Sequence, residues 1–107
     1  MSDRRIEIGK VLLEGTEKYL ALSVYHSTYS KSYVLSISVC WDNDHSVSHD
    51  LFAGTSVKLD PAPRYSAKVL ERVAAAASDF SSPLIKERID TVLIKNNFTR
   101  KGDLIEA

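Results

Sequence analysis

The sequence predicts an α+β fold: an antiparallel meander of about four strands over residues 4–59, then two helices over residues 62–80 and 83–97 packed on one face. Apolar residues recur at every second position in the first half of the chain and at helical spacing in the second half. Strands first and helices last are typical of a two-layer α+β domain. A length of 107 residues fits one compact domain over residues 1–107.

The two strongest strand patterns lie at residues 19–25 and 33–41, and the polar segment between them predicts an antiparallel hairpin. The parity expected to face the helices consists of Leu20, Leu22, Val24, Leu35, Ile37 and Val39. The opposite parity carries Tyr19, Ser23, Tyr25, Ser36, Ser38 and Cys40.

The first strand has its apolar residues in two phases, namely Ile6 and Ile8, then Val11 and Leu13. A β-bulge near Gly9 would restore the register, because glycine tolerates the backbone angles that a bulge needs. Downstream, residues 47–51 predict another strand and residues 57–59 a short fifth piece.

The first helix has two alternative starts. Either Asp60 is the N-cap with Pro61 at the first helical position, or Ser66 caps a later start. The predicted buried face consists of Tyr65, Val69, Val73, Ala76 and Phe80, with Leu70 and Ala77 at its edge. Charged residues on the other side make this the clearest amphipathic helix of the chain.

The second helix is expected to begin at Pro83, after the cap residue Ser82. Its predicted buried face is Ile85, Ile89, Val92 and Leu93, and a second, narrower apolar stripe is Leu84, Ile94 and Phe98. β-Branched residues favour strands, so a strand over residues 91–98 is the alternative to the end of this helix. Residues 99–107 are expected to be mobile or to add an edge strand.

Composition disfavours some classes of function. Hydrophobic residues make up 44% and charged residues 26%, and the formal net charge is zero, which disfavours nucleic acid and membrane surfaces as partners. A net charge of zero gives little repulsion between copies of the chain, so a homo-oligomer is also compatible with the sequence. A single cysteine, Cys40, allows no internal disulfide, and the N-terminus has no apolar signal-peptide core. We therefore expect a cytoplasmic protein, or one of the host cytosol if the gene is viral.

Acidic and histidine side chains cluster in residues 42–50, at Asp42, Asp44, His45, His49 and Asp50. Asp and Asn are common turn residues, and no ligand spacing matches a known calcium loop, so we predict a turn, with no metal and no cofactor. A metal site built from these five side chains is the alternative. Cys40 lies in a strand pattern rather than at a helix N-terminus, which disfavours a nucleophilic role.

The face opposite the helices is the predicted binding surface, because tyrosine offers rigid amphipathic area and serine offers adaptable hydrogen bonds. The partner-binding candidates are Tyr19, Ser23, Tyr25, Ser36 and Ser38. A plain solvated sheet face is the alternative explanation of the same residues.

The predicted function is a non-catalytic protein-binding module that acts sterically on another protein. A small stoichiometric inhibitor or an immunity-type protein, including a phage-encoded blocker of a bacterial defence complex, fits by size and architecture alone. One alternative is a domain that binds single-stranded nucleic acid by stacking bases on Tyr19 and Tyr25. Zero net charge and the scatter of the lysines, which include Lys10, Lys18, Lys31 and Lys58, oppose it. A small enzyme with a site in residues 42–50 is the other alternative.

Overall fold

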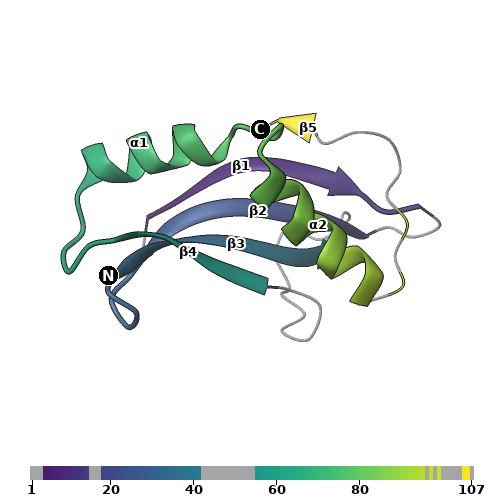
Figure 1. Ribbon diagram of the computed structural model, residues 1–107, viewed down its shortest axis with the longest axis horizontal. Helices are drawn as coiled ribbons and strands as arrows, with labels where there is room; N and C mark the ends of the chain where they lie inside the picture. Colours follow the sequence, from purple (N-terminus) through teal and green to yellow (C-terminus); the bar gives the residue numbers. More distant parts are fainter. Residues whose placement is uncertain are drawn as a thin grey trace.

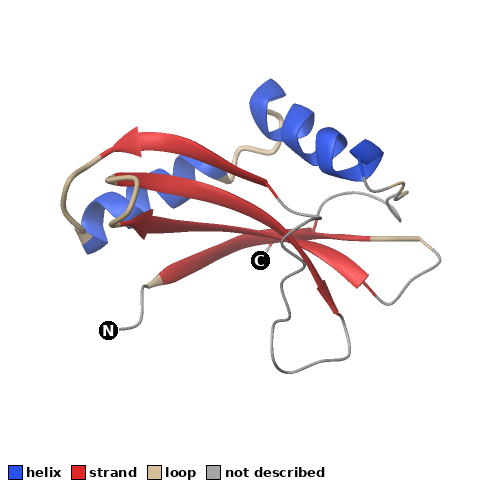
Figure 2. Ribbon diagram, turned by 90° about the horizontal axis from the view of Figure 1, so that it is seen from below, coloured by secondary structure: helices blue, strands red, loops and turns tan. Residues whose placement is uncertain are grey.

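The computed structural model describes residues 4–14, 18–41, 55–95, 97, 99 and 105–106. Its elements are β1 (Arg5–Leu12), β2 (Lys18–Ser27), β3 (Ser32–Trp41), β4 (Thr55–Pro61), α1 (Ala67–Ala77), α2 (Pro83–Lys95) and β5 (Ile105–Glu106). The strands pair antiparallel in the order β4-β3-β2-β1-β5 (Figure 1). Both helices pack against the sheet, which is strongly twisted (Figure 2), so the predicted α+β class is confirmed.

The core lies between the sheet and the two helices. The sheet residues of this core that have no exposed surface are Val11, Leu20, Leu22, Val24, Tyr33, Leu35 and Ile37. They pack in one cluster with apolar residues of α1 and α2. The parity that was expected to face the helices therefore does so, because strand side chains alternate between the two faces of a sheet.

The first strand contains the predicted bulge. Glu7 pairs with Ser23, but Gly9 pairs with Leu22, so Ile8 is the extra residue. This shift lets Ile8 and Val11, which are out of phase in sequence, both lie buried.

Helix α1 begins at Ala67, capped by the side chain of Ser66, which accepts a hydrogen bond from Val69 N at 3.4 Å. Of the two predicted starts, the later one is therefore the real one. The predicted span of residues 62–80 is too long at both ends, because the helix begins after the N-cap Ser66 and ends before the C-cap Ser78. The earlier start is excluded because Asp60 and Pro61 belong to strand β4.

The buried face of α1 differs from the prediction. Its buried residues are Leu70, Val73, Ala74 and Ala77, whereas Tyr65 is 46% exposed and Ala76 is also exposed. Four consecutive alanines leave the rotation of the helix ambiguous in the sequence. The observed rotation buries Leu70 completely, and a leucine removes more apolar surface from water than an alanine does.

Helix α2 buries the predicted residues Ile85, Ile89, Val92 and Leu93 and continues to Lys95, so residues 91–95 are helical. The second stripe is exposed at Leu84 (41%) and Ile94 (77%), and Phe98 lies outside the described residues. In the tail, Ile105 and Glu106 pair with Lys10 and Gly9 of β1, which is the predicted edge strand. The strand predicted over residues 47–51 also lies outside the described part of the chain.

A polar cluster joins the start of α1 to the sheet. The buried Tyr33 hydroxyl donates to Ser66 O at 3.1 Å and accepts from Ser66 N at 2.9 Å. His26, also buried, lies 2.9 Å through Nε2 from Ala62 O, and its ring meets that of Tyr33 edge-on at 5.0 Å. These contacts fix the chain that leads from β4 into α1, because buried polar groups are stable only when paired.

Candidate functional site

The sheet face that points away from α1 and α2, here called the open face, carries the predicted binding residues. The register of β2 and β3 pairs Tyr25 with Val34, Ser23 with Ser36, Ala21 with Ser38 and Tyr19 with Cys40. All five candidates, Tyr19, Ser23, Tyr25, Ser36 and Ser38, therefore share one face of the sheet. Their role in binding a partner stays a prediction.

Exposure divides these candidates into two groups. Tyr19, Tyr25, Ser36 and Ser38 are half-buried, whereas Ser23 is only 5% exposed. The four half-buried residues therefore provide the surface that a partner could contact, and Ser23 adds little to it.

A row of four side chains crosses the open face at one end. Register pairs Arg5 with Tyr25, Tyr25 with Val34, and Val34 with Lys58. The Cζ atom of Arg5 lies 4.6 Å from the centre of the Tyr25 ring, within the range of a cation–π contact. Arg5 and Lys58 are both exposed, whereas Val34 between Tyr25 and Lys58 is only 4% exposed. The row therefore presents an aromatic ring with one cation beside it on β1 and a second cation beyond Val34 on β4.

The contact of Arg5 with Tyr25 was not predicted from the sequence, although part of the signal was present. Ile6 and Ile8 share one phase of the strand pattern, which leaves Arg5 on the other. Pairing it with Tyr25 requires the register of β1 against β2, and that register depends on where the bulge falls.

Hydroxyl groups form the next row. Ser23 pairs with Ser36 and Ser36 pairs with Ser56, and Glu7 of β1 stands opposite Ser23. The hydroxyl oxygens of Ser36 and Ser38 lie 3.1 Å apart and share a hydrogen bond. Each hydroxyl has one donor and two acceptor positions, so this pair keeps capacity to bond a partner's polar groups.

The single cysteine is a poor nucleophile in this position. Cys40 has no exposed surface, and burial raises the pKa of its thiol, with the negative charge of Glu7 adding to the increase. A hydrogen bond to Tyr19 and the charge of Arg5 oppose this shift of the pKa without reversing it. The thiol is therefore protonated near neutral pH, whereas the thiolate is the reactive form.

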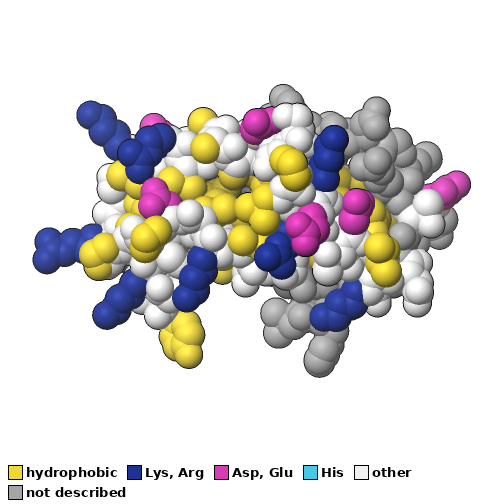
Figure 3. All heavy atoms as spheres, in the orientation of Figure 1, with side chains coloured by type: hydrophobic (Ala, Val, Ile, Leu, Met, Phe, Trp, Pro, Cys, Tyr) yellow, Lys and Arg dark blue, Asp and Glu magenta, His cyan; other side chains and the backbone are white. Residues whose placement is uncertain are grey.

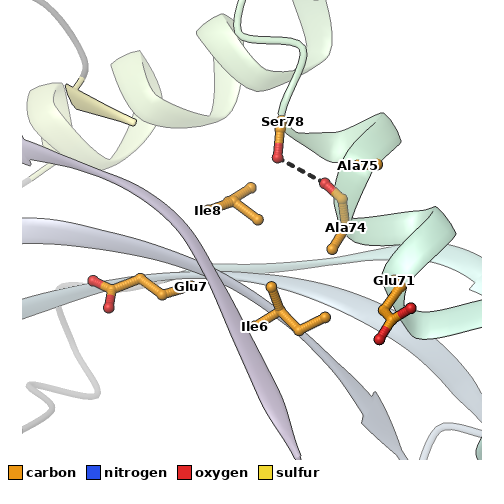
Figure 4. Close-up of a pocket in the computed structure, with 7 residues that line it drawn as sticks. All are labelled: Ile6, Glu7, Ile8, Glu71, Ala74, Ala75 and Ser78. Atoms are coloured by element: carbon orange, nitrogen blue, oxygen red, sulfur yellow. Dashed lines mark hydrogen bonds between the residues drawn. The ribbon is translucent and has the colours of Figure 1, made fainter. Parts of the chain in front are cut away.

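A pocket of about 310 Å³ lies between β1 and α1, lined mainly by Ile6, Ile8 and Ala74 (Figure 4). Two of its polar side chains are already engaged. The Ser78 hydroxyl donates to Ala74 O at 2.8 Å, and Glu71 pairs with Arg4 at 3.6 Å. The Glu7 carboxylate points away from α1 (Figure 4). The two glutamates therefore do not converge as an acid–base pair would.

A larger pocket of about 390 Å³, the interhelix pocket, opens between β4, α1 and α2. Its lining is mostly apolar and includes Leu59, Val73, Leu84 and Ile85. Figure 3 shows apolar side chains gathered over the middle of this side of the molecule. The ion pair between Arg72 and Asp60, at 3.3 Å, borders it. Sequence analysis did not foresee this pocket, because it depends on how far apart the two helices lie.

The acidic and histidine cluster at Asp42, Asp44, His45, His49 and Asp50 lies outside the described residues. The turn and the metal site that the sequence leaves as alternatives there both stay predictions. Within residues 4–14, 18–41 and 55–95, no group of three or more His, Cys, Asp or Glu side chains is placed to hold a metal ion.

The two described helices are too short and too polar to span a bilayer. Comparison with protein-family models, with curated proteins and with solved structures gave no match for this chain.

Proposed function

We propose that this chain is a non-catalytic protein-binding module whose open face docks on another protein and blocks that protein's working surface. The observation that carries the proposal is the row of Arg5, Tyr25, Val34 and Lys58 on a sheet whose helices pack against the other face. The finer proposal is a small stoichiometric inhibitor or an immunity-type protein.

The chemistry of this row suits recognition of a protein. Tyrosine and arginine are enriched among the residues that contribute most to protein–protein binding, because each combines a flat apolar surface with hydrogen-bonding groups. The Ser36 and Ser38 hydroxyls lie beside the row and add polar groups that adapt to a partner. A strand framework holds all of them, so little conformational entropy is lost when a partner binds.

Affinity purification from cells that naturally express the chain tests this proposal. We expect the wild-type chain to retain a partner identified by mass spectrometry, and Tyr25→Ala to lose it. The loss should reflect missing contacts, because Tyr25 is half-buried on the sheet surface and lies outside the core between sheet and helices.

Tyr29→Ala is the matched control, since Tyr29 is 98% exposed at the tip of the β2–β3 hairpin. It should retain the partner as the wild type does. Circular dichroism and urea unfolding establish that both variants are folded. A folded Tyr25→Ala chain that still captures the partner would refute binding through the open face.

A further inference from the structure

Charge is unevenly distributed over this electrically neutral chain. Four segments meet at one end of the molecule: the start of β1, the β2–β3 hairpin, the end of β4 and the start of α1. The contacts that join them include Ala62 N with Lys31 O at 2.9 Å and the bonds between Tyr33 and Ser66. We call this region the basic end, because it carries the exposed cations Arg4, Arg5, Lys31, Lys58, Arg64, Lys68 and Arg72.

Three carboxylates belong to the same segments. Asp60 and Glu71 each already pair with an arginine, Arg72 and Arg4 respectively, and Glu7 lies on the open face two residues along β1 from Arg5. Within the described part of the chain, the other five cations form no ion pair. Dark blue side chains gather accordingly at the left of Figure 3, where Figure 1 places the hairpin and the start of α1. Since exposed charges act over about 8–10 Å at physiological salt, a partner touching this end experiences the local excess of positive charge and not the neutral total.

We infer that the partner of the open face presents a carboxylate-rich protein surface to the basic end, with Arg5, held in place by Tyr25, as the anchor for one carboxylate. This inference rests on the proposed function and names the chemistry of the partner. Lys58, at the other edge of the same row, supplies a second contact for an acidic side chain.

The stacked position of Arg5 supports this assignment. Its guanidinium lies 4.6 Å from the centre of the Tyr25 ring, so the ring orders a side chain that would otherwise sample many rotamers. A guanidinium above the ring keeps N–H groups that are directed away from the ring and can bind a partner. Those N–H groups match the two oxygens of a carboxylate, which makes Arg5 a prepared binding group.

The same geometry disfavours single-stranded nucleic acid as the partner. Base stacking needs a free aromatic face, whereas Arg5 already covers Tyr25, and Lys10 Nζ lies 5.7 Å from the centre of the Tyr19 ring. The cations of the basic end also come from both sides of the sheet, with Lys58 on the open face and Lys68 on α1. They do not form a single track for a phosphate backbone.

The test is fluorescence anisotropy of two labelled probes, a Glu-rich peptide and an oligothymidylate of equal length, titrated with the full chain. We expect the peptide to bind, with an affinity that falls between about 50 mM and 200 mM salt. Arg5→Ala should weaken this binding about tenfold, the effect of losing one charge-assisted contact. Arg5→Lys should recover only part of it, because lysine keeps the charge without the planar fork.

Tyr25→Phe should bind the peptide as the wild type does, because phenylalanine retains the ring, whereas Tyr25→Leu should weaken binding towards the level of Arg5→Ala. Lys86→Ala removes an exposed cation from α2 and is the control for non-specific attraction. The inference is overturned if the wild type does not bind the peptide, or if Lys86→Ala weakens binding as much as Arg5→Ala. Tighter binding of the oligothymidylate than of the peptide would also overturn it and assign the basic end to nucleic acid.

Failure of this inference is distinguishable from failure of the proposed function. A natural partner that is lost with Tyr25→Ala but retained by the double variant Arg5→Ala, Lys58→Ala would leave the protein-binding function standing. It would show that the partner does not depend on carboxylates at the basic end.

Discussion

Replacing Tyr33 by phenylalanine tests the link between sheet and helix. The Tyr33 hydroxyl makes two hydrogen bonds to the backbone of Ser66, the N-cap of α1, at 2.9 and 3.1 Å. Phenylalanine fills the same space without them. Ser66 O keeps its bond from Leu70 N at 2.9 Å, but Ser66 N loses its acceptor at a partly buried position.

The expected cost follows from these contacts. Each hydrogen bond contributes about 0.5–1.5 kcal/mol net, and a buried donor left unpaired costs about 1–3 kcal/mol. We therefore expect Tyr33→Phe to lower the free energy of unfolding by about 2 kcal/mol. With a urea m-value of about 1.5 kcal/mol/M, the midpoint of unfolding falls by roughly 1 M.

Urea unfolding followed by far-ultraviolet circular dichroism measures this shift. Tyr29→Phe is the matched control, because its hydroxyl is carried by a side chain that is 98% exposed, and it should change stability by less than about 0.5 kcal/mol. If Tyr33→Phe and Tyr29→Phe gave the same small change, the Tyr33 hydroxyl would not hold α1 against the sheet, and the reasoning would be refuted.

Two further predictions concern single side chains. The Cys40 thiol, buried and with a raised pKa, should react with a maleimide more than about tenfold more slowly in the folded chain than in urea, and equal rates would contradict its burial. Hydrogen bonds from the Ser81 side chain and backbone lower the pKa of Asp79 below its ordinary value of 3.8. The ionised Asp79 carboxylate therefore stabilises the fold at pH values above 3.8. This stabilisation is lost as the pH falls through the lower pKa that Asp79 has in the folded state. Asp79→Asn should make the free energy of unfolding depend less on pH at and below about pH 4. An unchanged pH dependence would contradict the stabilising role of the Asp79–Ser81 hydrogen bonds.

The strand half of the fold was predictable because its signal is local. Alternation over Leu20, Leu22 and Val24 sets which side chains face the helices, and a one-residue shift of register would turn all of them towards the opposite face. The phase change around Gly9 likewise predicted the bulge, since only an extra residue brings both Ile8 and Val11 inside.

The helical half was less determined by sequence. Alanines on several sides of α1 give little preference among neighbouring rotations. The predicted buried face was therefore wrong at Tyr65 and Ala76, and Leu70, which was predicted at its edge, decides the packing instead. The start of α1 was also ambiguous between Asp60 and Ser66. Pairing of β4 with β3 resolves it, because Asp60 lies opposite Tyr33 in the sheet.

The sequence by itself determined the two-layer architecture, the parity of the strands and the placing of the tyrosine and serine candidates on one face, because these depend on spacing along the chain. Tertiary structure decided which cations lie together. Arg5, Lys31 and Lys58 are far apart in sequence, and antiparallel pairing of the strands brings them to one end of the molecule. Tertiary structure also decided the contact of Arg5 with Tyr25, since a contact between strands depends on register and not on the composition of either strand.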